Sequence, residues 1–283
     1  MRLLENKIAV VTGSSRGFGL AIAQAFASHG ASVVLASRSE EAIGKAVESI
    51  RATGARASGL ACDTADLKQV EALAEHTVHT LGGLHVWVNN AGMSPTYGPT
   101  AHIQPDEFVR TIQTNILGTY YGSVVALRHF LPHQSGKLLN ILGAGARGPV
   151  PMQNAYASGK AWIRNFTLAL AQEYKDSGVG VYALSPGMML TEMLTSVRVV
   201  AGYEERLRVY PTVVRALAKP PEAAARKAVW LASAATDGRT GLEVHLFNPM
   251  TALLGFTREW IRRLTGRTDT LSPLDITSVP PAI

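Results

Sequence analysis

The feature that most constrains the fold of this chain is the alternation of short apolar runs with longer segments of helical periodicity. Apolar runs rich in valine, leucine and isoleucine are typical of buried strands. We expect strands at residues 8–12, 32–36, 57–62, 86–89, 137–142, 179–184 and 242–247. Helical patterns are expected between them at residues 17–28, 40–53, 65–81, 107–131, 155–177 and about 221–234.

Strands that alternate with helices form right-handed βαβ units, in which helices cover both faces of a parallel sheet. We therefore predict an α/β fold with a doubly wound, Rossmann-like sheet in three α/β/α layers. Hydrophobic residues make up 47% of the 283 residues and charged residues 17%, which argues for one large core and against disorder. We assign this domain to residues 1–248. Residues 249–283 are expected to form an amphipathic helix and an extended tail.

A glycine-rich turn stands between the first predicted strand and the first predicted helix. Glycines permit a tight turn and a close approach of the backbone to a pyrophosphate, and the helix directs free N–H groups at that phosphate. A flexible loop with chance glycines is the alternative, but the position favours a dinucleotide site. The predicted cofactor contacts in this turn are Gly13, Ser15, Arg16, Gly17, Phe18 and Gly19.

The end of the second predicted strand distinguishes the two nicotinamide dinucleotides. Sites that prefer NAD usually carry an acidic residue there, which binds the ribose 2′-hydroxyl. Ser37 and Arg38 stand at this position instead. A guanidinium binds a 2′-phosphate that a carboxylate would repel, and Arg16 can add a second positive charge. The sequence therefore predicts NADP(H), with a merely solvated Arg38 as the alternative.

Further cofactor contacts are expected where later strands end, because open α/β sheets bind ligands at the carboxyl ends of their strands. Asp63 follows the third predicted strand, and its carboxylate can accept a hydrogen bond from the adenine amino group. Asn90, Ala91 and Gly92 follow the fourth predicted strand.

Several motifs occur in the order found in the short-chain dehydrogenase/reductase family, and the chain resembles that family over about residues 5–248. They are the turn Thr12-Gly13-x3-Gly17-x-Gly19, the run Asn89-Asn90-Ala91-Gly92, Asn115, Tyr156-x3-Lys160 and Pro186-Gly187-x3-Thr191. The resemblance implies an NADP-dependent oxidoreductase that moves hydride to or from a carbonyl carbon. It also implies a homodimer or homotetramer assembled through long helices such as residues 107–131 and 155–177.

The resemblance further implies a role for each matching residue. Tyr156 is expected to be the general acid or base. Lys160, one helical turn later on the same face, is expected to favour the tyrosinate and to hold the nicotinamide ribose. Asn115 is expected to organise a water that links Lys160 to solvent. Contacts near the carboxamide of the nicotinamide are expected from Pro186, Gly187, Met189 and Thr191.

One position departs from the family pattern. The family usually has a serine 13 residues before the tyrosine, and Gly143 stands there. That serine hydrogen-bonds the substrate carbonyl oxygen, and losing such a donor without a substitute costs about a hundredfold in rate. Three explanations stay open. A backbone N–H of residues 143–145 or the side chain of Gln153 or Asn154 replaces it, the substrate needs little polarisation, or the protein binds NADP without efficient turnover.

The departure is itself similar to the chlorophyll b reductase subfamily, which has an Asn-x-x-Gly-Ala-Gly stretch like residues 140–145 and a run like residues 185–192. This narrower resemblance implies NADPH-dependent reduction of a ring formyl group on a tetrapyrrole. A general reductase of lipid-like or polyketide-like ketones and an NADP-binding regulatory protein with weak catalysis are the alternatives. Methionine lines adaptable apolar surfaces, so we expect a bulky apolar carbonyl substrate. The expected pocket residues are Met93, Gly143, Met152, Asn154, Met188 and Met193.

The C-terminal extension has its own pattern. Leu253, Phe256, Trp260 and Leu264 recur every three or four residues and form one apolar helix face, with Arg258, Arg262, Arg263 and Arg267 nearby. Such a helix can rest on an anionic membrane, cover a bulky substrate or dock on a neighbouring subunit. Docking on protein is the more common outcome for such a helix in a soluble chain, and membrane contact is a further hypothesis.

The remaining signals exclude other classes of protein. The net charge of +6 comes without a basic patch interleaved with aromatic residues, so we expect no nucleic-acid partner. No histidine pair has a third ligand nearby, so we predict no metal. The single cysteine, Cys62, fits a reducing compartment. Without a spanning apolar run or a signal-peptide pattern, we expect a cytoplasmic protein, with peripheral membrane contact as the open alternative.

Overall fold

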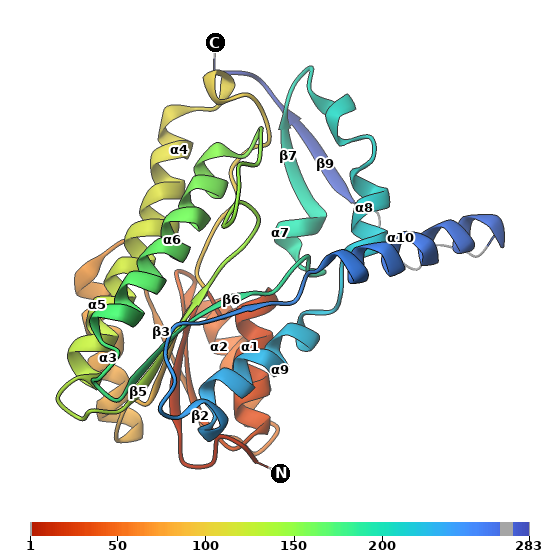
Figure 1. The fold of residues 1–283 in the computed structure, drawn as a ribbon. Helices are drawn as coiled ribbons and strands as arrows, with labels where there is room; N and C mark the ends of the chain where they lie inside the picture. Colours follow the sequence, from red (N-terminus) through yellow and green to blue (C-terminus); the bar gives the residue numbers. More distant parts are fainter. Residues whose placement is uncertain (1, 267–273, 283) are drawn as a thin grey trace.

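The computed structural model describes residues 2–266 and 274–282, and a parallel sheet of seven strands forms its centre (Figure 1). The strands lie in the order β3-β2-β1-β4-β5-β6-β8. The order reverses between β1 and β4, and this switch point opens a crevice at the carboxyl ends of the strands. The doubly wound prediction is confirmed. The strands are β1 Ile8–Thr12, β2 Ser32–Ser37, β3 Ala57–Ala61, β4 Val86–Asn89, β5 Gly136–Ile141, β6 Val179–Ser185 and β8 Leu242–His245.

Helices cover both faces of the sheet, which gives the three predicted layers (Figure 1). Neighbouring residues of one strand serve opposite layers: Val33 is buried in the core of one face and Val34 in that of the other. One core is completed by α1 Gly17–Ser28, α2 Glu40–Arg51 and α9 Pro221–Ala232, and the other by α3 Leu67–Leu81, α5 Gly118–Phe130 and α6 Asn154–Glu173.

The helical stretch expected at residues 107–131 is present but is not uniform. α4 Pro105–Ile112 leads into a π-helical segment, η2 Gln113–Leu117, before α5 begins. The wide turn contains the buried Asn115, and π-helical turns often occur at functional sites. The helix expected at residues 155–177 ends earlier, at Glu173.

The segment after β6 contains elements that the sequence did not predict. These are α7 Glu192–Thr195, β7 Ser196–Val200, η3 Glu204–Leu207 and α8 Tyr210–Leu217. β7 pairs in parallel with β9 Asp275–Val279, from Ser196 opposite Asp275 to Val200 opposite Val279. The tail that we expected to be merely extended is therefore, in part, a strand of a second sheet (Figure 1).

The helix expected in the C-terminal extension is present as α10 Pro249–Leu264. Asn248 and Thr251 form a capping box at its start, and Pro249 occupies the first turn, where a missing N–H costs nothing. Arg267 and the expected tail at residues 272–273 lie outside the described residues. Within the described part of the chain, no helix is long and apolar enough to cross a membrane.

Candidate active site

The loops that follow β1 and β4 are joined by Thr12 and Asn90. The Thr12 hydroxyl oxygen accepts the backbone N–H groups of Asn90 and Ala91, both at 3.0 Å. The Asn90 side-chain amide donates to the carbonyl oxygens of Thr12 at 2.9 Å and Gly13 at 3.1 Å. A Cβ on Gly13 would lie 2.7 Å from the Ala91 Cα, so only glycine permits this approach. The fold thus brings two predicted cofactor segments, the loops after β1 and β4, into direct contact.

The first turn of α1 is open to an anion. The helix begins after Arg16, no side chain caps it, and its first turn holds no acidic residue. Gly17 has a φ of +58°, and a Cβ on Gly19 would lie 2.3 Å from the Gly13 carbonyl oxygen. The uncapped N–H groups and the positive end of the helix dipole fit a pyrophosphate. Phe18 is buried in the core below, so its backbone alone is available to a cofactor.

Ser14 connects the glycine-rich turn to β2. Its buried hydroxyl accepts the N–H of Ala36 at 3.0 Å and donates to the Val11 carbonyl oxygen at 2.6 Å. This link holds the end of β2, with Ser37 and the exposed Arg38, beside the turn. Ser14 was not among the predicted site residues.

Arg16 and Asp63, which were also predicted for the cofactor, each contact another part of the protein. Arg16 forms an ion pair with Glu192 at 2.5 Å, which joins the glycine-rich turn to the start of α7. Both side chains are exposed, so this pair is weak and replaceable by a charged ligand. The Asp63 carboxylate accepts the N–H of Ala65 at 3.0 Å, which shapes the loop after β3.

Tyr156 and Lys160 lie one turn apart near the start of α6. The Lys160 Nζ donates to the Ile141 carbonyl oxygen at 2.8 Å and lies 5.6 Å from the centre of the Tyr156 ring. Burial lowers the pKa of Lys160 to about 8 and raises the pKa of Tyr156 to about 12. Near neutral pH, Tyr156 is therefore a neutral phenol that can donate a proton, beside an ammonium group.

Asn115 clamps the loop after β4. Its side-chain oxygen accepts the N–H of Met93 at 2.9 Å, and its amide nitrogen donates to the Met93 carbonyl oxygen at 2.9 Å. A side chain that makes this two-point contact fixes the backbone of Met93. Asn115 and Met93, predicted for the catalytic group and the substrate pocket, are thus direct neighbours.

Gly143 lies directly against Tyr156. A Cβ built on Gly143 would stand 2.2 Å from the Tyr156 hydroxyl oxygen and 3.0 Å from the Tyr156 Cζ. The tyrosine hydroxyl therefore occupies the space that the β-carbon of a serine at position 143 would need. Asn154, one candidate to replace the serine, donates from its side chain to the Thr100 hydroxyl at 2.6 Å.

The segment predicted to meet the nicotinamide lies between β6 and α7. Thr191 faces Gly17 of the glycine-rich turn, with its Cγ2 3.5 Å from where a Cβ on Gly17 would be. Met188 is held by its carbonyl oxygen, which accepts the N–H of Lys219 at 3.0 Å. The cleft beside this segment is lined mainly by Pro186, Gly187, Met188, Met189, Leu217 and Phe247. Met193, on α7, is 46% exposed.

The loop that carries Met93 meets both the loop that carries Met152 and β7. Gly98 donates its N–H to the Met152 carbonyl oxygen at 3.0 Å, and Tyr97 forms a parallel bridge with Val199 of β7. The sequence did not indicate this junction, because its signal is a pairing between segments about a hundred residues apart.

Glu107 reinforces the same junction. Its carboxylate accepts the backbone N–H of Thr96 at 3.0 Å and forms an ion pair with Arg198 of β7. Its side chain is only 13% exposed. Glu107 therefore ties α4 to both the loop after β4 and β7, although sequence reasoning did not single it out.

Comparison with known proteins agrees with this architecture. Residues 7–200 match the family model described as short chain dehydrogenase. The chain is 33% identical over 255 residues to 3beta-hydroxysteroid dehydrogenase 1 of Eggerthella lenta, which covers 89% of this chain and 97% of that protein. A solved structure of a variant of actinorhodin polyketide ketoreductase with NADPH matches with a TM-score of 0.78 and 25% identity, covering 90% of this chain and 99% of the other.

A plant relative bears on the narrower resemblance. The chain is 28% identical over 277 residues to a probable chlorophyll(ide) b reductase of Arabidopsis thaliana. The match covers 90% of this chain but 53% of the plant protein. Since the family model spans more than half of the chain and the bacterial relative matches over nearly its whole length, this chain belongs to the short-chain dehydrogenase/reductase family of oxidoreductases.

Proposed function

We propose that this chain is an NADPH-dependent reductase of a bulky apolar carbonyl compound. The observation that carries the proposal is the arrangement of Tyr156, Lys160 and Gly143. A protonated phenol lies beside a buried ammonium group. Because position 143 is a glycine, the phenol oxygen occupies the space that the β-carbon of a serine would need. Reduction needs a proton donor at this point, and Tyr156 is the only side chain for which we infer that role.

The crevice fits a nicotinamide dinucleotide phosphate in its chemistry. The uncapped start of α1 would hold the pyrophosphate. Ser37 and Arg38 would hold the 2′-phosphate, because a guanidinium matches a phosphate in charge and geometry. The segment 186–191 would hold the carboxamide, and Lys160 the nicotinamide ribose. When bound, NADPH supplies the hydride that is transferred to the carbonyl carbon.

The side chains of the protein supply the proton and its stabilisation. Tyr156 donates its proton to the carbonyl oxygen, and its raised pKa keeps that proton available throughout the neutral range. The ammonium of Lys160, fixed by the Ile141 carbonyl oxygen, stabilises the tyrosinate that remains. Asn115 holds the Met93 loop at the edge of the site.

The formyl group of chlorophyll b or a related tetrapyrrole is the substrate we favour. Support comes from the similarity to the plant reductase and from Gly143, which suits a conjugated aldehyde that needs little polarisation. Lipid-like or polyketide-like ketones are the second candidate, supported by the likeness to the polyketide ketoreductase. A regulatory NADP-binding protein is the third, and the intact pairing of Tyr156 with Lys160 argues against it. A homodimer or homotetramer stays a prediction.

The test follows the visible spectrum of chlorophyllide b with the protein and NADPH. We expect the pigment bands to shift with the wild-type protein and with the control Tyr120→Phe, which alters an exposed tyrosine on α5. Tyr156→Phe should abolish the shift. If the bands do not move while NADPH binds, the hypothesis of a tetrapyrrole substrate is wrong. Activity on a panel of bulky ketones then distinguishes a ketone reductase from a regulatory NADP-binding protein.

A further inference from the structure

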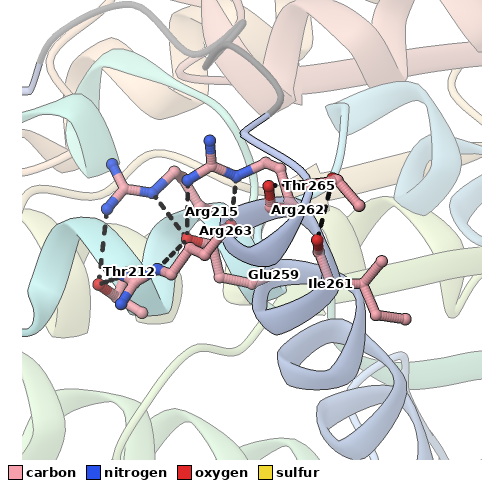
Figure 2. Close-up of polar contacts among 7 residues, drawn as sticks. All are labelled: Thr212, Arg215, Glu259, Ile261, Arg262, Arg263 and Thr265. Atoms are coloured by element: carbon pink, nitrogen blue, oxygen red, sulfur yellow. Dashed lines mark hydrogen bonds and ion pairs between the residues drawn. The ribbon is translucent and has the colours of Figure 1, made fainter.

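Helix α10 is docked on the enzyme through its polar side. A Cβ on Gly255 would lie 2.2 Å from the Ala216 carbonyl oxygen, so the backbones of α10 and α8 approach as closely as glycine allows. One turn later, Glu259 is only 5% exposed. Its carboxylate binds Arg215 of α8 at 3.3 Å together with Arg262 and Arg263 of its own helix (Figure 2). The polar face of this amphipathic helix is therefore the buried one.

The apolar side of α10 faces away from that contact. At about 100° per residue, the apolar residues of the helix fall on the arc opposite Gly255 and Glu259. Five of them are 62–66% exposed and two more are 42–49% exposed. We call this set the apolar arc: Met250, Leu253, Leu254, Phe256, Trp260, Ile261 and Leu264. Thr257 lies within the same arc, and its hydroxyl donates to the Leu253 carbonyl oxygen at 2.9 Å. A surface this rich in exposed apolar side chains marks an interaction site, because a soluble surface rarely carries one.

The charges around the apolar arc indicate what covers it. Glu259 is the one acidic residue of α10, and it is already engaged by arginines. The exposed Arg258 and Arg263 lie at the two edges of the arc. A second copy packed through its own α10 would bring arginines against arginines without a compensating carboxylate, whereas an anionic lipid surface matches both the apolar arc and its basic edges.

The position of α10 connects this surface to the active site. Figure 1 shows α10 beside α8 and extending away from the central sheet. The residue Phe247, just before α10, lines the same cleft as Met188 and Leu217. Any partner surface that binds α10 is therefore close to this cleft. The cleft itself borders the proposed nicotinamide position.

We propose that α10 lies in the interface of an anionic bilayer with its apolar arc inserted, and that the enzyme takes a carbonyl substrate dissolved in that bilayer. The proposed binding of α10 to the bilayer is argued from the geometry of α10 alone. The choice of substrate class rests on the proposed reductase function, since it requires turnover at Tyr156.

The binding step is tested with sedimented vesicles of phosphatidylcholine containing phosphatidylglycerol, without NADPH or substrate. The wild-type protein should bind these vesicles and bind pure phosphatidylcholine vesicles at least about tenfold more weakly. Leu253→Ser with Trp260→Ser should weaken binding at least about tenfold, since both side chains lose their burial in lipid. The matched control, Leu3→Ser with Val78→Ser, removes two exposed apolar side chains elsewhere and should bind like the wild type.

A spectroscopic measurement locates the contact. The fluorescence of the wild-type protein should shift to shorter wavelength on anionic vesicles, and Trp260→Phe should remove that shift while vesicle binding persists. Absence of wild-type binding to anionic vesicles overturns the proposal. The proposal is also overturned if the double variant binds vesicles normally. It is likewise overturned if sedimentation velocity shows that the only change in the double variant is dissociation of an oligomer.

The substrate step has its own readout. With a long-chain aldehyde dissolved in anionic vesicles, the double variant should reduce it at least about tenfold more slowly than the wild type, while both reduce a short soluble aldehyde equally. Equal rates on the vesicle aldehyde would overturn the link between α10 and substrate delivery. If neither aldehyde is reduced, and neither chlorophyllide b nor the panel of bulky ketones is reduced, while vesicles still bind, the reductase proposal fails and the membrane contact stands.

Discussion

The proposed cofactor side of the crevice is held together by hydrogen bonds between neighbouring strand ends, whereas the proposed substrate side includes a small second sheet whose outer edges lie at the surface. On the cofactor side, Thr12, Ser14 and Asn90 join three strand ends through hydrogen bonds of 2.6–3.1 Å. Thr12 and Ser14 are almost fully buried. A site built in this way has little freedom to rearrange, because its contacts are buried or partly buried and are supported by the sheet.

We place the proposed substrate side at β7, β9 and the loop after β4, because that loop carries Met93 and contacts β7 through Tyr97. The edges of this small sheet are tied by exposed polar pairs, such as Ser196 with Asp275 at 3.0 Å and Ser278 with Glu204 at 2.6 Å. Contacts of this kind contribute little each and open at low cost in free energy. We infer from this difference that the proposed cofactor side is fixed more firmly by the fold, and that the proposed substrate side can adapt to a large ligand.

The largest expected effect tests the meeting point of the two sides. In Gly143→Ser, the new Cβ displaces the Tyr156 hydroxyl, from which it would stand 2.2 Å away. We expect the rate of carbonyl reduction to fall about a hundredfold, because a displacement of about 1 Å at a reacting group has that effect. Steady-state kinetics measure it. A rate increase would mean that the serine donor is restored and that Tyr156 moves aside freely.

The next effect probes the cofactor side alone. Arg38→Glu should raise the Kd for NADPH roughly 10- to 100-fold and leave the Kd for NADH nearly unchanged, since only a 2′-phosphate meets the reversed charge. Fluorescence titration of both dinucleotides measures the two constants. Lys45→Glu makes the same charge change on the exposed face of α2 and serves as the control. If both variants raise the Kd for NADPH equally, Arg38 contributes only through the net charge of the protein and does not bind the 2′-phosphate directly.

The sequence could predict the cofactor side because its signals are local. A glycine that must adopt positive φ, as Gly13 and Gly17 do, leaves a mark at its own position. Tyr156 and Lys160 are likewise predictable as neighbours from the geometry of one helix turn. The fold class followed from the same kind of information, because strand and helix periods are properties of short segments.

The substrate side could not be predicted because it depends on distant pairings. Val197 and Ile276 show no sequence feature that assigns one to the other, yet they lie in register in the second sheet. The contact of Glu107 with Arg198 is equally distant. The sequence also could not predict that the apolar arc of α10 is exposed. Periodicity shows that a helix has an apolar face, but it does not show whether that face is buried or in contact with solvent.

A smaller effect concerns the pH dependence that burial creates. The lowered pKa of Lys160, about 8, means that its ammonium is lost as the pH rises past that value. We expect the reduction rate to fall about tenfold between pH 7 and pH 9, because the tyrosinate then loses its stabilising charge. A pH–rate profile measures the fall, and Lys160→Arg, which keeps its charge, should be slower but flat over this range. A wild-type rate that stays level to pH 10 contradicts the expectation.

The same buried groups have an opposite signature in stability. Below pH 8, Lys160 is charged in both the folded and the unfolded chain, and burial of that charge destabilises the fold. Between about pH 8 and the unfolded value of 10.5, the unfolded chain binds more protons at this group, so Lys160 contributes a rise in the free energy of unfolding with pH. The rise should be clearest between pH 8 and pH 9, because above pH 9 the raised pKa of the buried Cys62 opposes it. Above pH 10, Tyr156 with its raised pKa reverses the trend, because the folded chain then retains the extra proton.

The smallest effect tests whether the substrate side is as separable as its surface contacts suggest. Removing residues 274–283 deletes β9 and leaves β7 paired only with Tyr97. The segment must then be ordered when substrate binds, and an ordering cost of about 1 kcal/mol raises KM for a bulky substrate roughly fivefold. The Kd for NADPH should not change. Removing only residues 280–283 keeps β9 and should preserve KM. Should the longer truncation instead weaken NADPH binding, the two sides would be coupled through β7, and the division between a rigid cofactor side and an adaptable substrate side would be wrong.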